Sequence, residues 1–303
     1  MCEHVVHTVQ EIRDEFSEKC REQLEKSYTK RGFHFLCCVD GSDNAHLAYD
    51  VCMALRRKYD YVSIFHAYRD CQEEVPEKYR ADTIRTKYAH ELALHMSPTY
   101  SSLHWEGRHD RSVIDTLQDY IHSCDGASNH PDFIVLGHAG RKGKGYFAPL
   151  TSNCDWVLRT IRIPCIIARP ISPPRRDGRT WLMAVDGTIY SNRGLDIILQ
   201  LMGARDRLDL FYIFTTTEDA DHLQQMKLLY EGELDRSAPH GCSFTLVELE
   251  LGKDIKHGIV EYVNAANADF FAIGPRARAT QSLSMVTSYV INNVTCSIVV
   301  CKN

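Results

Sequence analysis

The sequence has no long apolar run and no excess of positive charge. No stretch approaches the roughly 18 apolar residues of a membrane span, and no apolar signal core lies near the N-terminus. The 303 residues carry 35 Lys and Arg against 40 Asp and Glu, a net charge of −5, without a basic stripe. These absences argue against membrane and nucleic-acid partners and predict a cytoplasmic protein.

Motifs of the common enzyme classes are also missing. We find no G-x-S-x-G, no Walker loop and no kinase-like set of motifs. His90 and His95 are five residues apart, so they cannot share the helix face that a zinc-protease motif requires. We therefore predict no catalytic residues and no metal ligands, and at most slow ATP hydrolysis.

The 12 cysteines include no C-x2-C pair, which argues against a zinc site or a disulfide framework. They are typical of small buried hydrophobic residues in a reducing compartment. Cys154 would be redox-sensitive only if the start of a predicted helix lowers its pKa, which is the alternative to this interpretation.

One pattern is present twice. An apolar run that ends in Val-Asp-Gly-Ser at residues 39–42 is repeated as a run that ends in Val-Asp-Gly-Thr at residues 185–188. The segments over 156–167 and 289–300 are also alike. A repeat of about 140 residues indicates two complete domains rather than small stacked units. The predicted parts are an N-terminal helical extension (1–31), a first domain (32–170), a Pro-rich linker (171–179) and a second domain (180–303).

Strand-like and helix-like periods alternate in both halves. This alternation predicts an α/β fold of two tandem doubly wound domains, each a five-stranded, mainly parallel sheet with helices on both faces. Pro76 is expected in the first turn of a helix. Strands are expected near 33–39, 61–67, 101–105, 132–136 and 165–169, and near 180–185, 208–214, 243–248, 269–273 and 297–301; helices of the first half are expected near 43–59, 77–96, 110–123 and 151–160.

The end of the fourth predicted strand carries two close glycines, Gly137 and Gly140. Without a Cβ, they let backbone N–H groups approach an anion, and Ser152 is placed to cap the next helix and donate its hydroxyl. The alternative is a flexible turn. In a doubly wound sheet the first and fourth strands are neighbours, so Asp40, at the end of the first, lies in the same crevice. Its alternative role is an Asx turn that caps the following helix.

Together these features resemble the universal stress protein family in its tandem form. ATP-binding members have an aspartate after the first strand and the loop G-x2-G-x9-G-[ST] after the fourth. Here the loop reads Gly137-x2-Gly140-x10-Thr151-Ser152, one residue longer and with Thr151 at the third glycine. The resemblance implies that Asp40 contacts the ribose and that the backbone of Ala67, just past the second strand, contacts the adenine. It also implies a set of phosphate contacts, made by Gly137, Gly140 and Ser152 with the amides of Arg141 and Asn153.

The second half has lost this loop, although it keeps Asp186. Its sequence reads Gly274-Pro275-Arg276-Ala277 and then Ser284-Met285. Pro275 has no N–H, Ala277 places a methyl group where the second glycine should be, and Met285 replaces the hydroxyl donor. We predict that the second domain binds no ATP. It is expected to act as an intrachain dimer partner, with 166–169 pairing with 298–301, because family members commonly dimerise through the last strand.

The leading hypothesis is a stress-associated protein whose first domain binds ATP or AMP, with or without Mg²⁺. One alternative is a nucleotide-independent protein-interaction module, and another is a weak ATPase. The segment 1–31 carries an apolar stripe that is expected to pack on its own chain or to contact a partner. The sequence leaves open the protein partner and whether the chain forms a homodimer.

Overall fold

The computed structural model describes residues 32–126, 129–140, 150–171, 178–237, 241–274 and 283–302. Residues Phe33–Asn303 form one compact unit, to which the description below refers. Several predictions fall outside the described residues: the N-terminal helix over 1–31, most of the linker, and the loop residues Arg141 and Pro275–Ala277.

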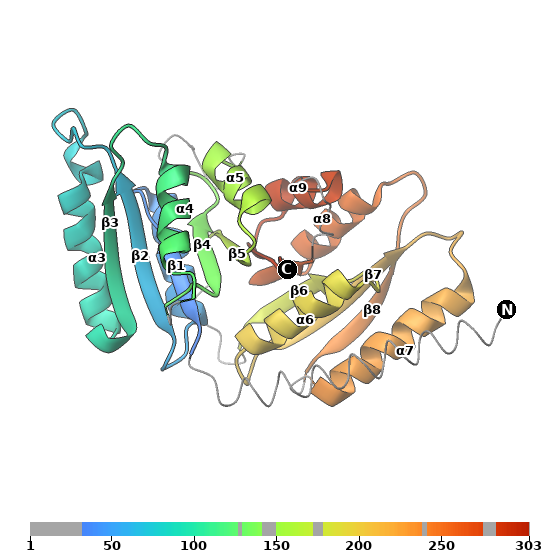
Figure 1. The fold of residues 1–303 in the computed structure, drawn as a ribbon. Coiled ribbons are helices and arrows are strands. Elements are labelled where there is room, and N and C mark those ends of the chain that lie inside the picture. The colour runs from blue at the N-terminus through green and yellow to red at the C-terminus, as the bar shows by residue number, and fades with distance from the viewer. Residues whose placement is uncertain are drawn as a thin grey trace. The chain divides into compact units, whose positions relative to one another are not determined.

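The elements alternate between strands and helices, as the sequence predicts (Figure 1). The first half contains β1 (His34–Cys38), α2 (Asp43–Leu55), β2 (Tyr61–Tyr68), η1 (Glu77–Tyr79), α3 (Ala81–His95), η2 (Pro98–Tyr100), β3 (Ser101–Gly107), α4 (Val113–Ser123), β4 (Phe133–Gly137), α5 (Ser152–Thr160) and β5 (Cys165–Ala168). The second half contains β6 (Thr180–Ala184), α6 (Ile189–Leu201), β7 (Arg207–Phe214), α7 (Ala220–Ser237), β8 (Ser243–Glu248), α8 (Ile255–Ala265), β9 (Phe270–Ile273), α9 (Met285–Asn293) and β10 (Ser297–Val300).

Pro76 does not stand in the first turn of an α-helix, so that prediction is wrong. It precedes the short 3-10 turn η1, and α3 begins only at Ala81. The residue between them, Arg80, is extended with φ −70° and ψ 144°, which separates the two helical segments.

The described strands lie in one sheet with the order β3-β2-β1-β4-β5-β10-β9-β6-β7-β8. Strand β1 pairs in parallel with β4, and β6 with β9, so the predicted neighbours are confirmed. Strands β5 and β10 pair antiparallel, with Ile166 opposite Val299, and this pairing joins the two halves. The predicted edge pairing is therefore present, and it turns two mainly parallel sheets into one.

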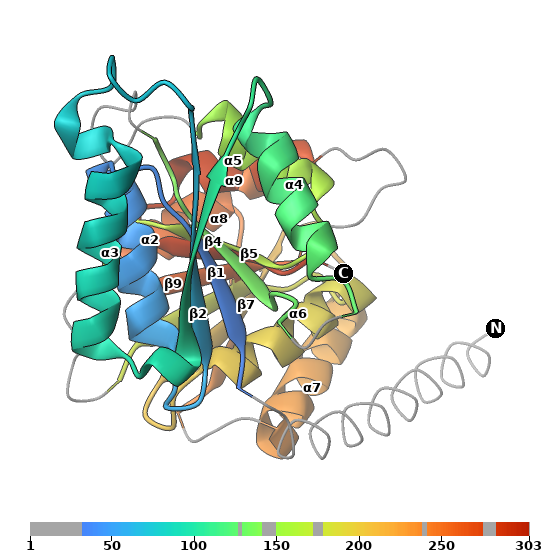
Figure 2. The same cartoon turned by 60° about the vertical axis from the view of Figure 1, so that its left-hand side comes forward.

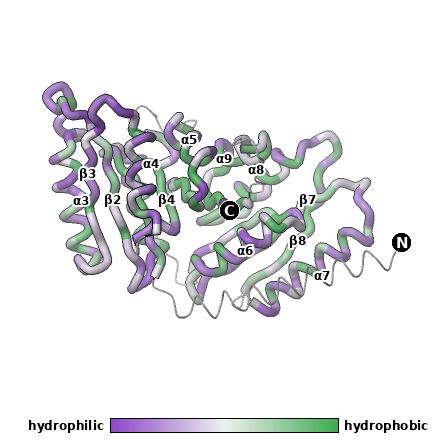
Figure 3. Tube along the Cα trace, in the orientation of Figure 1, coloured by the Kyte–Doolittle hydropathy of each residue, from purple (hydrophilic) through white to green (hydrophobic). Residues whose placement is uncertain are grey.

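In the part of the chain that the structure describes, helices from both halves cover each face of the sheet. Helices α2, α3, α6 and α7 bury one face, and α4, α5, α8 and α9 bury the other. Figure 2 shows α2 and α3 on one side of the first-half strands and α4 on the opposite side. In Figure 3 the hydrophobic segments gather in strands such as β4, while α3 and α7 carry many hydrophilic residues. Among the described residues no helix is long and apolar enough to cross a bilayer.

Two basic side chains complete the junction between the halves. Arg169, after β5, donates from Nη2 to the carbonyl of Ile291 in the last turn of α9, at 3.1 Å. Lys302, after β10, donates from Nζ to the carbonyls of Val157 and Ile161 at the end of α5, both at 2.8 Å. Each half thus caps a helix of the other, which gives the junction the reciprocity of a two-fold dimer interface.

Candidate functional site

Asp40 and Gly140 meet at the carboxyl ends of β1 and β4. A methyl group on Gly140 would lie 3.1 Å from Asp40 Oδ2 and 3.7 Å from Thr151 Cγ2. The residue after β1, the loop after β4 and the start of α5 therefore converge at one point. This point is the switch position of a doubly wound sheet, where ligands of such folds bind.

The turn after β1 is built around the carboxylate of Asp40. Oδ1 accepts hydrogen bonds from the Ser42 amide at 2.9 Å and the Ser42 hydroxyl at 2.6 Å, and Ser42 caps α2. The second half repeats this turn, since Asp186 Oδ1 accepts from the amide and hydroxyl of Thr188 at 3.1 and 2.5 Å. The Asx-turn role is thus present in both halves. Asp40 differs from Asp186 in being half-buried, with Oδ2 facing Gly140.

Gly137 has a packing role that requires no ligand. A Cβ at this position would lie 2.2 Å from the backbone oxygen of Asn44, because the first turn of α2 passes directly over the end of β4. Gly274 stands in the same relation to α6, with a Cβ 2.5 Å from the backbone oxygen of Tyr190. The first glycine of the loop is therefore explained in both halves by close helix–strand approach, whereas Gly140 is not.

Helix α5 begins one residue earlier than its predicted cap implies. Thr151, not Ser152, is the N-cap, and its hydroxyl accepts from the Cys154 amide at 3.3 Å. Threonine and serine both cap helices well, so the sequence alone does not decide between two adjacent candidates. Ser152 and Asn153 occupy the first two helical positions and are exposed. Their amides lie where an α-helix offers N–H groups and partial positive charge to an anion.

Ala67 lies inside β2 and not just past it, which corrects the predicted position. It is opposite Glu106 of β3 and half-buried. Strand β2 pairs with β1 in the same register in which β7 pairs with β6, so the residue of the second half that corresponds to Ala67 is Ile213. Ile213 is 8% exposed. The first half therefore has a small side chain where the second half has a larger buried one.

Cys154 does not meet the condition set for redox sensitivity, because its pKa is raised rather than lowered. The side chain is 5% exposed, and Sγ lies 3.1 Å from the carbonyl oxygen of Gly137, to which it donates. Burial raises the pKa of Cys154 to about 11, and the contact with Thr151 lowers it only in part. Burial outweighs the helix start because a thiolate here would lose its hydration. Within the described residues, no three His, Cys, Asp or Glu side chains group as a metal site.

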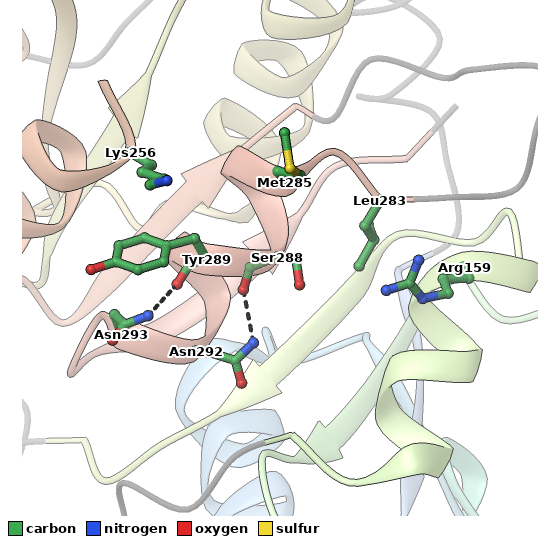
Figure 4. Close-up of a pocket in the computed structure, with 8 residues that line it drawn as sticks. All are labelled: Arg159, Lys256, Leu283, Met285, Ser288, Tyr289, Asn292 and Asn293. Carbon is green, nitrogen blue, oxygen red and sulfur yellow. Dashed lines mark hydrogen bonds between the residues drawn. The ribbon is translucent and has the colours of Figure 1, made fainter. Parts of the chain in front are cut away.

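A separate open pocket of about 550 Å³ lies where α5 approaches α8 and α9 (Figure 4). Its polar groups are largely engaged with their own elements: Arg159 pairs with Asp155 at 2.7 Å, and Asn292 donates to the carbonyl of Ser288 at 2.8 Å. Asn292 Oδ1 also accepts from the Leu150 amide at 3.1 Å, which ties the residue before α5 to the second half. The pocket is lined by Arg159, Lys256, Leu283, Met285, Ser288, Tyr289, Asn292 and Asn293.

Comparison with solved structures places this architecture among the universal stress proteins. One from Archaeoglobus fulgidus superposes with a TM-score of 0.58 and 15% identity, over 89% of this chain and 98% of that one. A functionally unknown protein from Pseudomonas aeruginosa gives 0.58 and 15%, over 89% and 92%. The cytoplasmic domain of a prokaryotic cation chloride cotransporter gives 0.52 and 9%, over 90% and 96%. No protein family and no curated protein matches the chain in sequence. The chain thus has the universal stress protein fold in a tandem arrangement.

Proposed function

We propose that the first half, residues 32–170, binds an adenine nucleotide, ATP or AMP, at the carboxyl ends of β1, β2 and β4. The observation that carries the proposal is the meeting of Asp40 Oδ2 and Gly140 beside the first turn of α5. A ribose requires a hydrogen-bond acceptor, and a phosphate chain requires a backbone without a Cβ and the N–H groups of a helix start. All three lie at one place here.

Each described group has a task in such a complex. A carboxylate has more acceptor sites than Ser42 uses, so Asp40 can keep its turn and still accept a ribose hydroxyl. Gly140 admits the phosphates without a Cβ in their way. The amides of Ser152 and Asn153 would donate to phosphate oxygens, and charge-assisted bonds of this kind contribute about 1.5–3 kcal/mol each.

The second half is proposed to bind no nucleotide and to serve as the intrachain partner of the first. Met285, which is 87% exposed, stands at the helix position of Ser152, and the buried Ile213 stands at the position of Ala67. Nucleotide occupancy in the first half alone would then alter a surface that another protein reads.

A nucleotide-independent interaction module is the second candidate. It is favoured by one observation: Asp40 and Gly137 make the same local contacts as Asp186 and Gly274, where we propose no nucleotide. If the protein is such an interaction module, the loop after β4 only connects β4 to α5. Calorimetric titration of the chain with nucleotide then detects no binding.

The matched pair Asp40→Asn and Asp186→Asn tests the proposal. Asparagine preserves the Asx turn in both halves, so stability should change little in either variant. Titration calorimetry with AMP and with ATP, with and without Mg²⁺, should show binding weakened about 10- to 100-fold by Asp40→Asn, from the loss of a charge-assisted bond. Asp186→Asn should bind like the unmodified chain. Equal effects of the two variants, or none in Asp40→Asn, would contradict the proposal.

A further inference from the structure

The residues of α9 that face the open pocket carry no charge. Four of them stand at the i, i+3, i+4 and i+7 positions and so form one stripe along the helix: Met285, Ser288, Tyr289 and Asn292. We call these four residues the α9 stripe. Met285 is 87% exposed, and the other three are partly exposed. Methionine and tyrosine are enriched in the contact surfaces of proteins, where Asp, Glu and Lys are depleted, so the α9 stripe has the composition of a contact surface.

Helix α5 shows what the same positions hold in the first half. Both helices have nine residues, so the equivalent stripe of α5 consists of Ser152, Asp155, Trp156 and Arg159. Its second and fourth residues form an ion pair, with Arg159 Nε 2.7 Å from Asp155 Oδ2. In α9 these two positions are Ser288 and Asn292, and the side-chain amide of Asn292 donates to the Ser288 carbonyl at 2.8 Å. The second half thus has an uncharged face where the first has an ion pair.

Two cations stand at opposite ends of the pocket, and none of the described residues that line it is acidic. Figure 4 shows Arg159, from the last turn of α5, on one side and Lys256, from the first turn of α8, on the other. Each has a carboxylate partner outside the lining, Asp155 at 2.7 Å and Asp254 at 3.1 Å. That partner binds Arg159 through Nε, and an ammonium has three donors, so both cations keep donors for a further acceptor.

More apolar side chains surround the start of α8 and α9. Leu283 lines the pocket just before α9. Ile255, the chain neighbour of Lys256, is 48% exposed, and Leu251, in the loop that leads into α8, is 98% exposed. Exposed apolar residues that occur singly are ordinary, whereas several of them beside one pocket mark an interaction site.

We propose that this pocket is the docking site for a short segment of a partner protein, and that the segment carries a large apolar side chain and a carboxylate. The apolar side chain packs against Met285 and Leu283, and the carboxylate pairs with the cations at the ends of the pocket. A second copy of the chain is a poorer occupant, because a symmetric contact between two such pockets brings like charges together. The proposal does not rest on nucleotide binding in the first half.

Selection from a random library of short peptides displayed on phage tests the proposal on the full chain without nucleotide. The recovered peptides should combine a large apolar residue with Asp or Glu, because the pocket offers apolar surface and unmatched donors. Fluorescence anisotropy of their synthetic forms should give dissociation constants in the micromolar range, as expected for one small pocket. Recovery of basic peptides, or of no binding peptide, would overturn the proposal.

Met285→Glu is the variant that should remove binding. The side chain is exposed at the first position of α9, where a glutamate suits the helix dipole, so the fold should be unaffected. The peptides should bind at least about tenfold more weakly, because an apolar contact is lost and a like charge is added. Leu228→Glu, at a 60% exposed leucine of α7, is the matched control and should leave the affinity unchanged. Equal binding to the unmodified and Met285→Glu chains would overturn the proposal.

Two further measurements test the carboxylate and the choice of occupant. A chain with both Lys256→Gln and Arg159→Gln should bind the peptides about fivefold more weakly, the upper range for one exposed ion pair, and with less dependence on salt. Unchanged affinity and salt dependence would refute the carboxylate. Sedimentation should show no self-association that depends on Met285. A dimer that Met285→Glu abolishes would make a second copy the occupant and contradict the proposed partner.

Discussion

Gly137 and Gly140, the two glycines at the end of β4 and in the loop after it, have different roles. Gly137 is required by the fold, because any Cβ would overlap the Asn44 backbone, and backbone atoms cannot move aside cheaply. The nearest atom to a Cβ at Gly140 belongs to the Asp40 side chain, which can shift by a few tenths of an ångström. A motif match at Gly137 is therefore weak evidence for a nucleotide, and the evidence rests on Gly140.

This difference predicts opposite behaviour of two alanine variants. Gly137→Ala should lower the free energy of unfolding by about 1–3 kcal/mol, as overpacking does, and Gly274→Ala should do the same in the second half. Gly140→Ala should leave stability nearly unchanged and weaken nucleotide binding. Urea denaturation and calorimetric titration of the same three proteins separate the two effects. A Gly140→Ala protein as unstable as Gly137→Ala would show that both glycines are structural.

At the residue scale the sequence was informative where local chemistry decides the outcome. The Asx turn of Asp40 follows from the Asp-Gly-Ser order alone, and the structure confirms it. The cap of α5 and the position of Ala67 were each misplaced by about one residue, since adjacent residues of similar propensity compete. The pKa of Cys154 went the opposite way because burial depends on the packed sheet, which the local sequence does not encode.

At the element scale, the ends of α5 and α9 depend on residues from the opposite half. The carbonyls of Val157 and Ile161 receive the Lys302 ammonium, and the Ile291 carbonyl receives the Arg169 guanidinium. A cation at a helix C-terminus also interacts favourably with the helix dipole. The strand pairing of β5 with β10 and the two helix caps are thus parts of one junction.

Lys302→Met is predicted to destabilise the protein by about 1–3 kcal/mol, because it removes the ammonium that donates to the Val157 and Ile161 carbonyls. Of these two, in the described part of the chain, only the Val157 carbonyl keeps a backbone hydrogen bond, from the Ile161 amide. Methionine keeps the length of the side chain and removes only the charge and its hydrogen bonds. Lys227→Met is the control, since Lys227 is an exposed lysine on α7 whose ion pair with Glu231 spans 3.8 Å. Chemical denaturation should show little effect of the control, and equal effects of the two variants would contradict the cap.

Strand and helix positions were predictable because hydrophobic periodicity is strong in both halves, and the pairing of the last strands followed from the resemblance to a family whose members commonly dimerise through the last strand. The helix caps by Arg169 and Lys302 were not predictable, because each contact joins residues more than a hundred positions apart. The hydrogen-bonded row of His34, Ser63, Ser102 and His104 was also missed, since no motif links four residues on three strands. Polar residues at inward-facing positions of neighbouring predicted strands are the signal that would have found it.

At the scale of the whole molecule, one sheet with a continuous core on each face unites the two halves. The same architecture occurs in a universal stress protein and in the cytoplasmic domain of a cotransporter, so the fold by itself does not settle the function. The differences between the halves carry the functional argument. Asp40 and Gly140 meet in the first half, and in the second half an exposed Met285 and a buried Ile213 stand at the positions of Ser152 and Ala67.

Calorimetric titration of the unmodified full chain, shown beforehand to be folded and free of carried-over nucleotide, tests the central claim most directly. We predict saturable binding of AMP or ATP with one nucleotide per chain. The expected dissociation constant is in the micromolar range, which corresponds to a binding free energy of about −8 kcal/mol. Two nucleotides per chain would contradict the assignment of the site to the first half alone. No heat at high micromolar nucleotide would contradict nucleotide binding itself and favour the interaction module.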